Sequence, residues 1–462
     1  MSYIVVLLIF SSATYFTWTR GISFAFAWVY LPVLVLLSAT KAISLPLLPD
    51  MTSQFAVGYG VLAGLALKGG ERLTIRWNLL DTIMTALWLL NAISAGVTEG
   101  SELLRNSLGD GFFDFLTPYF MARIAFQSAD GRRAAFWSAT ACACIVALMA
   151  PIEMRLWPQF WSRQLDALGL YTPANSMALY RFGLARAQTT FWQPMDQGNC
   201  GILLAGLIGI FATTTSIGLR NWRPLAAIGV AIFVSMASLS FSAFLNIAVA
   251  SGIFFALRAI PDLGRVVAVF VFIGILGGAA VTNHLLSRPL GERDDKLGQS
   301  VTDSLYMRTK IVQQSWPVVQ EAGWFGFGKK ISKDTLDLDS VDNAYLLMIM
   351  QKGWPYFLLF LSIPFVIALR TSSAFCVAPT ESQRLPVMFS AAVLFAILIA
   401  MYTVFFGFVY ARLLIVMLGL FSSITDVLIG RVMLESERPI ASLPIARRRE
   451  STGGFPAIAR GS

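Results

Sequence analysis

Length, composition and charge exclude most classes of protein at the outset. Of the 462 residues, 56% are hydrophobic and only 13% are charged, and the mean hydropathy is +0.67. A soluble domain carries about twice that share of charge. Because apolar runs close to the roughly 20 residues that cross a bilayer recur along the chain, the sequence predicts an all-α, polytopic transmembrane protein.

The net charge of +9 does not indicate a nucleic-acid partner. The excess Lys and Arg residues fall in short loops between predicted spans and in the C-terminal tail, where such residues set membrane orientation and contact anionic lipid. We therefore expect the lipid bilayer, and no nucleic acid, as the partner of these charges.

We predict 12 to 14 membrane spans, whose ends are defined only to within several residues. Segment 3–18 is short for a span, and segment 109–127 carries Asp114, Pro118 and Arg123. Gly353 and Pro355 interrupt the span at 343–369, so we expect a kink or a shallow membrane entry there. The predicted spans are 3–18, 22–40, 52–67, 79–97, 109–127, 134–152, 194–214, 222–240, 242–258, 265–282, 343–369, 386–405 and 407–429.

Basic residues cluster in alternate loops and predict the orientation of the spans. These loops fall on one side of the predicted topology, which is assigned to the cytoplasm. The long polar loops 153–193 and 282–342 then face the periplasm. Residues 1–435 form one transmembrane domain, and 436–462 are expected to be a disordered, basic cytoplasmic tail. The basic loop residues are Lys68, Arg72, Arg76, Arg132, Arg133, Arg220, Arg223, Arg258, Arg265, Arg370 and Arg384.

Neither the cysteines nor the acidic residues predict a metal site or a cofactor. Cys142, Cys144 and Cys200 fall in predicted spans and Cys376 in a cytoplasmic loop, which favours neither a disulfide nor a zinc site. The sequence also lacks an acidic triad of the kind that binds a divalent cation.

Three periplasmic clusters carry residues suited to chemistry. The first is the loop 181–198, in which Arg181 and Arg186 lie beside aromatic residues, and Pro194 suits the start of the next helix. Guanidinium groups bind phosphate in a bidentate manner, and aromatic rings stack on sugars. The alternative is two interfacial arginines within an aromatic belt, which is common at the ends of spans.

The second cluster lies in the polar loop 282–342. A helix predicted at about 303–320 carries Arg308 and Lys310 on its polar face, and its apolar stripe fits a helix lying on the membrane surface. The alternative is an amphipathic lid whose arginine has no special role. A run of glycines at 323–328 follows and predicts a tight turn with close backbone approach. The stripe consists of Leu305, Ile311, Val312, Trp316 and Val319.

The third cluster is Asp342-Asn343, at the start of the span 343–369. Such a pair is first of all a helix N-cap. The functional alternative is a carboxylate at the bilayer edge, where partial desolvation raises the pKa toward that of a general base. Asn343 would then be a neutral hydrogen-bond donor beside it.

The order of these clusters resembles the O-antigen ligase/polymerase superfamily of bacterial membrane glycosyltransferases. The chain has an arginine-rich loop, a long exterior loop with an arginine-bearing helix, a Trp-Phe-Gly-x-Gly turn, and x-Asn-x-Tyr-Leu entering a helix. Ser238–Ala243 also resembles the family's Ser-rich segment, although its usual arginine is missing. The resemblance covers most of the chain in topology and roughly 180–355 in motif.

The resemblance implies polymerisation or ligation of undecaprenyl-diphosphate-linked glycans, at the periplasmic face of the bacterial inner membrane. Chain-length regulators and export proteins would be partners, and no metal or cofactor is needed if arginines hold the pyrophosphate. The implied catalytic residues are Asp342, Asn343 and Arg308. The implied pyrophosphate- and sugar-binding residues are Arg181, Arg186, Lys310, Arg412 and Tyr345.

One departure from the family bears on the reaction. Ligase members usually carry His-Asn where this chain has Asp342-Asn343, and the only histidine, His284, lies far upstream. A histidine base at the motif is therefore excluded, and Asp342 is the candidate to deprotonate the acceptor hydroxyl. This substitution favours repeat-unit polymerisation over transfer to lipid A-core, and both alternatives remain open.

Two other classes of function compete with glycosyl transfer. A transporter or flippase of lipid-linked sugar would need charged residues deep in its spans, paired for coupling ions, and often two related halves. The sequence offers Asp81, Asp114 with Arg123, and Asp196 as such residues, and no inverted repeat is evident. A non-catalytic assembly partner is the third class.

Overall fold

The structure is a computed structural model that describes most of the chain. The predicted span 265–282, His284 and Asp342 lie outside the described residues, as does the tail from residue 437 onward. The described residues are 2–37, 51–69, 75–167, 179–181, 183–191, 193–215, 217–218, 221–259, 299–328, 343–378, 380–401 and 408–436.

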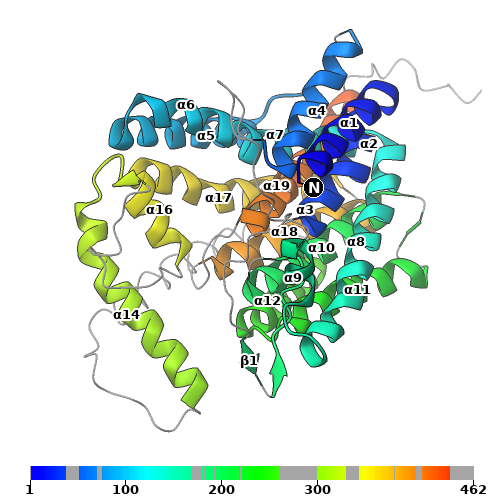
Figure 1. The fold of residues 1–462 in the computed structure, drawn as a ribbon. Helices are drawn as coiled ribbons and strands as arrows, with labels where there is room; N and C mark the ends of the chain where they lie inside the picture. The colour runs from blue at the N-terminus through cyan, green and yellow to red at the C-terminus, as the bar shows by residue number, and fades with distance from the viewer. Residues whose placement is uncertain are drawn as a thin grey trace, which may run out of the picture.

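The described chain is helical apart from one short β-hairpin, which confirms the predicted all-α membrane fold (Figure 1). The N-terminal elements are α1 (Ser2–Arg20), α2 (Ile22–Ala25), η1 (Phe26–Tyr30), α3 (Leu31–Leu36), α4 (Ser53–Leu67), α5 (Leu79–Glu99), α6 (Ser101–Gly111), η2 (Phe112–Leu116), α7 (Thr117–Gln127), α8 (Ala129–Arg155) and α9 (Phe160–Ala167). The remaining elements are β1 (Tyr180–Arg181), β2 (Leu184–Ala185), α10 (Pro194–Thr214), α11 (Trp222–Ala237), α12 (Phe241–Ala259), α14 (Gln299–Glu321), α16 (Ala344–Lys352), α17 (Trp354–Val377), α18 (Glu381–Ala400) and α19 (Phe408–Ser436).

Seven of the described helices are long and apolar enough to cross a bilayer: α5, α8, α10, α12, α17, α18 and α19. Three shorter apolar segments, 22–36, 53–67 and 222–237, coincide with predicted spans as well. The chain is therefore a multi-pass membrane protein, while the total of 12 to 14 spans stays a prediction.

The centre of the bundle is formed by α10, α18 and α19, which are the most buried of the long helices (Figure 1). Glycines let α10 approach its neighbours closely. A Cβ atom on Gly209 would lie 2.6 Å from the ring of Phe389 on α18, and one on Gly201 would lie 2.5 Å from the backbone of Ser235 on α11. Small residues at such contacts are the usual means of packing helices in a membrane.

The span predicted at 343–369 is broken into two helices at Gly353, which confirms the expected kink. Gly353 has φ 83° and ψ 175°, a conformation that is essentially restricted to glycine. The glycine run packs on this break: the Phe327 N–H donates to the Met350 carbonyl at 2.7 Å, and Gly326 lies against the backbone of Gln351. The close backbone approach predicted for this glycine run is thus confirmed.

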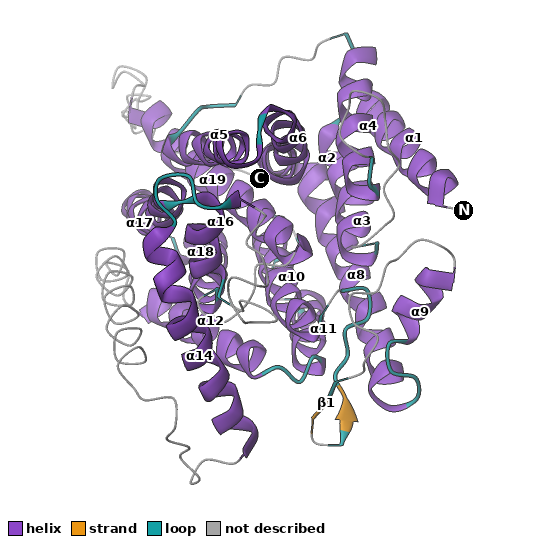
Figure 2. Cartoon of the chain, turned by 60° about the vertical axis from the view of Figure 1, so that its left-hand side comes forward, coloured by secondary structure: helices purple, strands orange, loops and turns teal. Residues whose placement is uncertain are grey.

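Helix α14 lies at the edge of the molecule and reaches the bundle through α16 (Figure 2). Ile311, Val312 and Val319, from the predicted apolar stripe, are buried against Leu346 and Ile349 of α16. The stripe was predicted to lie on the membrane surface, but over these residues α16 covers it instead. The amphipathic pattern correctly predicted the helix, although it could not tell a protein partner from a lipid one.

An ionic cluster joins four helices at the end of the bundle that carries Arg132. The buried Arg123 of α7 forms ion pairs with Asp81 of α5 and Asp426 of α19, and Asp426 also pairs with Arg370 of α17. Tyr119 donates its hydroxyl to Asp81 at 2.7 Å. We call this end of the bundle the Arg132 end. Arg258 lies there too and pairs with Glu381 at the start of α18.

Candidate functional site

Arg181 and Arg186 are brought together by the β-hairpin and lie on the same backbone turn. Strands β1 and β2 pair antiparallel, with Gly183 at φ 73° in the turn between them. The Arg181 Nη1 atom donates to the Leu239 carbonyl at 2.9 Å, and Arg186 Nε donates to the Ser238 carbonyl at 3.1 Å. Two neighbouring carbonyls therefore orient two guanidinium groups without neutralising them.

The turn that supplies these carbonyls is the Ser-rich segment between α11 and α12. The backbone of Leu239 has φ 47°, a left-handed conformation that residues other than glycine rarely adopt. Ser238 Oγ accepts from the Ser240 N–H at 3.2 Å and donates to the Ser235 carbonyl at 2.8 Å. The serines thus hold the turn in a conformation that points its carbonyls at the arginines.

Glu153, near the end of α8, anchors the loop that follows the hairpin. Its carboxylate accepts from the backbone N–H groups of Gln188 at 3.1 Å and Thr189 at 2.7 Å, and from that of Trp161 at 3.1 Å. Removing the carboxylate would leave three buried or half-buried donors without their partner. Sequence reasoning missed this residue, because nothing in the pattern of α8 relates it to a loop more than 30 residues away.

The electrostatics of the hairpin favour an anionic ligand. Burial, and then the neighbouring Arg181, lower the pKa of Arg186 from 12.5 to about 10. Arg186 therefore remains a cation at physiological pH, next to a second cation. A phosphate bound to both would relieve their repulsion and gain charge-assisted hydrogen bonds.

Asn343 caps the start of α16, which confirms the N-cap predicted for it. Its Oδ1 accepts from the backbone N–H groups of Tyr345 and Leu346, both at 3.1 Å. The amide N–H groups of Asn343 take no part in this cap. Tyr345 is held rigidly, since its hydroxyl donates to the Leu398 carbonyl of α18 at 2.6 Å.

The arginine hairpin lies at the same end of the bundle as the start of α16. Ser238, which Arg186 contacts, lies against Gly198 in the first turns of α10. Asp196 lies two residues earlier, and both Asp196 and Tyr345 are close enough to Tyr410 of α19 to interact with it electrostatically. The hairpin, Asp196, Tyr410 and Asn343 thus share one end of the bundle, which we call the Asn343 end.

No described hydrogen bond or ion pair links the other predicted site residues to the hairpin. Arg412 is one helical turn from the start of α19 and pairs with Asp114, so Asp114 is not the partner of Arg123. Lys310 is half-buried on α14. Helix α14 also carries Arg308, whose side chain lies outside what the structure describes, as does the whole of Asp342.

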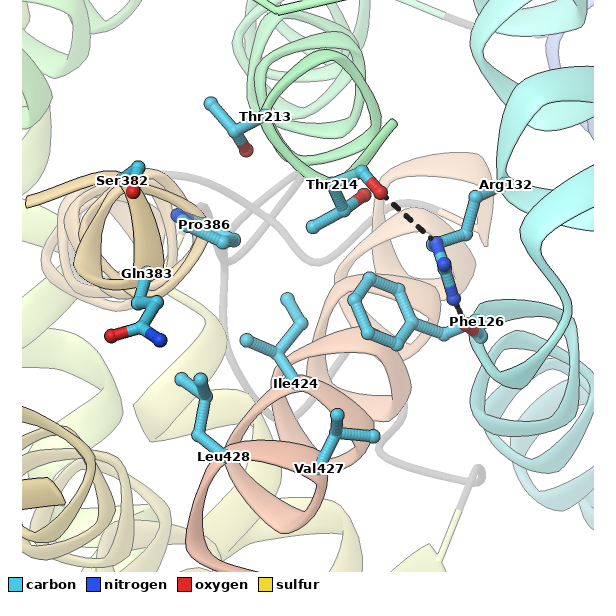
Figure 3. A pocket seen from close by; sticks show the side chains of 10 residues that line it. All are labelled: Phe126, Arg132, Thr213, Thr214, Ser382, Gln383, Pro386, Ile424, Val427 and Leu428. Carbon is cyan, nitrogen blue, oxygen red and sulfur yellow. Dashed lines mark hydrogen bonds between the residues drawn. The ribbon is translucent and has the colours of Figure 1, made fainter. Parts of the chain in front are cut away.

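A cavity of about 220 Å³ lies at the opposite, Arg132 end of the bundle (Figure 3). Arg132 lines it and donates from Nε to the Thr214 carbonyl at 3.3 Å and from Nη1 to the Phe126 carbonyl at 2.6 Å. The predicted arginines and Asn343 are not among its lining residues. Across the described segments, no group of His, Cys, Asp or Glu residues is arranged to hold a metal ion.

The Ser-rich turn and α16 lie in a part of the chain that matches a known protein family. Residues 225–361 match the O-antigen ligase family. The match supports membership of the O-antigen ligase/polymerase superfamily, as the resemblance predicted. It covers the Ser-rich turn, α14, the glycine run and α16, while the arginine hairpin precedes it. No curated protein matches the chain.

Proposed function

We propose that this protein polymerises undecaprenyl-diphosphate-linked oligosaccharide repeat units into a surface polysaccharide, by inverting and metal-independent glycosyl transfer at the periplasmic face. The observation that carries the proposal is the arginine hairpin, which presents two cations beside the region matched to the O-antigen ligase family. With this assignment, the partners of the protein are a lipid-linked glycan, the bilayer, chain-length regulators and export proteins.

In the proposed reaction, one group of residues binds the donor's pyrophosphate and another activates the acceptor hydroxyl. The donor's pyrophosphate lies against Arg181, Arg186 and Arg308, whose fixed positive charge stabilises the oxygen that gains charge as the sugar departs. An acceptor hydroxyl attacks the anomeric carbon from the opposite face, and a carboxylate accepts its proton. Asp342 is the carboxylate that the family motif suggests, and Asn343 would orient the acceptor with its amide N–H groups, which take no part in the helix cap.

Ligation of glycan to lipid A-core is the alternative within the same family. The donor and the arginines would be the same, and only the acceptor would differ. The Asp342-Asn343 pair in place of His-Asn is the observation that favours polymerisation.

A transporter is the second candidate, because acid–base pairs do occur within the bundle. The four charges of the ionic cluster at the Arg132 end are balanced and mutually hydrogen-bonded. Such closed pairing suits a clamp between helices better than a site that must bind and release an ion. A carrier of lipid-linked sugar nevertheless remains the rival that the assay must separate.

The experiment is reconstitution of the protein in liposomes with undecaprenyl-diphosphate-linked repeat units and without added metal. A ladder of products supports polymerisation, and product formed only after addition of lipid A-core indicates a ligase. Movement of lipid-linked sugar without any product indicates a transporter. Arg186→Ala should abolish chain growth, whereas Arg258→Ala, which removes an exposed arginine at the Arg132 end, should not.

A further inference from the structure

Asp196 is a buried carboxylate that the fold does not explain. It lies in the first turn of α10, and only 6% of its surface is exposed. Among the described residues, none donates a hydrogen bond to its side chain or forms an ion pair with it. An unpaired carboxylate is costly to bury, so proteins normally pair it or expose it.

Asp196 does not cap α10, although an acidic residue in the first turn of a helix often has this role. An Asp at the third position of a helix can accept from the N–H of the N-cap residue. In α10 the N-cap is Gln193, and no side-chain capping bond forms. The positive field of the helix N-terminus favours the negative charge of Asp196, but this supplies no hydrogen bond.

A second group without a partner lies one helical turn further along α10. Asn199 uses its Oδ1 to accept from Asn246 of α12 at 2.8 Å, and its buried Nδ2 has no hydrogen-bond partner. Residues three apart on a helix share a face. A hydroxyl both donates and accepts a hydrogen bond, so it suits an open acceptor at Asp196 and an open donor at Asn199.

The position of Asp196 fits a reacting hydroxyl in the proposed reaction. It lies two residues before Gly198, against which the Ser-rich turn that holds the arginines packs, and at the same Asn343 end of the bundle as the start of α16. Asp196 forms no ion pair with Arg181 or Arg186 among the described contacts, so those cations are free for the donor's pyrophosphate.

We propose that Asp196, rather than Asp342, binds the attacking hydroxyl of the acceptor glycan and accepts its proton. This inference rests on the proposed function. In the step, the acceptor O–H proton passes to the carboxylate of Asp196 as the acceptor oxygen bonds to the donor's anomeric carbon. The bond from that carbon to the diphosphate oxygen breaks, and its electron pair leaves with the lipid diphosphate.

The test compares Asp196→Asn with wild type and with Glu381→Gln, a control at the exposed start of α18. Chain growth, binding of the undecaprenyl-diphosphate donor and the melting temperature in detergent are measured for each. Loss of a general base lowers the rate by about 10²- to 10⁴-fold. We expect a loss in that range for Asp196→Asn, with donor binding kept and the melting temperature unchanged or raised, because an unpaired buried charge has been removed.

Three results would overturn the inference. Chain growth by Asp196→Asn at the wild-type rate would mean that the carboxylate holds only a buried water. A melting temperature lowered together with activity, or loss of donor binding, would indicate a structural or donor-binding role. Absence of any glycan product from wild type would instead reject the proposed function, so the two failures are distinguishable.

Discussion

The two hairpin arginines differ in what surrounds them, and Arg186 is the more constrained. It is half-buried, its Nε is held by the Ser238 carbonyl, and its pKa is lowered to about 10 by burial and by Arg181. Even so, it stays charged across the physiological range. A lysine has an ordinary pKa of only about 10.4. In the same place its pKa would therefore lie closer to physiological pH than that of Arg186.

We therefore expect Arg186→Lys to make donor binding sensitive to alkaline pH. Burial and the Arg181 charge disfavour the protonated amine, so its pKa falls and the cation is lost as pH rises. Wild type should bind the donor equally from pH 7 to pH 9, whereas the variant should weaken toward pH 9. Binding titrations across this range test the point, with Arg258→Lys as the control. Parallel profiles for all three proteins would contradict it.

At the hairpin, the sequence indicated candidate residues, whose role stays a prediction, but not the contacts between them. Clustered arginines beside aromatic residues indicated a phosphate site, and the Ser-rich segment resembled a family motif. The arginines contact the Ser-rich segment through backbone carbonyls, whose direction depends on the positive φ of Leu239. No pattern of residue types reveals this backbone conformation. Asp196 was noted only as a charge near a span, because a missing partner is visible only in three dimensions.

At the scale of elements, the junction of α16 and α17 is fixed by backbone packing. A Cβ atom on Gly353 would lie 2.1 Å from the Trp324 carbonyl oxygen, and its backbone conformation strains any other residue. Gly353→Ala should lower stability by at least the roughly 1–3 kcal/mol of the backbone strain. Thermal unfolding in detergent measures this.

Gly252 provides the matched control for that substitution. It lies inside α12 with open space around the position of a Cβ atom. Alanine is favoured over glycine in a helix by up to about 1 kcal/mol, so Gly252→Ala should leave the melting temperature unchanged or raise it. Equal melting temperatures for the two alanine variants would show that the close packing of Gly353 on Trp324 does not hold the junction.

The ionic cluster is the second device at this scale, because it ties α5, α7, α17 and α19 together. Removing Arg123 would leave the buried Asp81 without its cation, and would leave the half-buried Asp426 with Arg370 alone. Loss of one partner from a buried pair costs about 3–5 kcal/mol. Arg123→Ala should thus lower the melting temperature strongly, whereas Arg258→Ala, from an exposed pair, should change stability by about 1 kcal/mol or less. Similar melting temperatures would refute the clamp.

At the scale of the whole molecule, hydropathy predicted most of the helices that the structure describes. Apolar runs gave the spans within a few residues, since a bilayer demands continuous helical hydrogen bonding. The packing order was not predictable. Hydropathy alone does not distinguish α10 from more peripheral helices such as α12, although α10 lies at the centre. The packing of α14 on α16 was not predictable either, because an amphipathic pattern does not show whether lipid or protein covers the apolar face.

The two ends of the bundle also predict how the protein lies in the membrane. Exposed Cys376 lies at the end of α17, on the predicted cytoplasmic side, and exposed Tyr180 lies in the hairpin on the predicted periplasmic side. A membrane-impermeant maleimide should label Tyr180→Cys in intact spheroplasts, in a background carrying Cys376→Ala. It should label Cys376 of the wild type only after permeabilisation. The reverse pattern would place the candidate site in the cytoplasm.

The central claim is that the hairpin arginines hold the diphosphate of a lipid-linked glycan donor. Equilibrium binding of undecaprenyl-diphosphate-linked glycan to Arg181→Ala/Arg186→Ala, Arg258→Ala and wild type tests it most directly. Charge-assisted hydrogen bonds contribute about 1.5–3 kcal/mol each, so the double variant, which loses at least two of them, should bind at least about 100-fold more weakly. Arg258→Ala should bind as wild type does. Equal affinity of all three folded proteins would contradict the account.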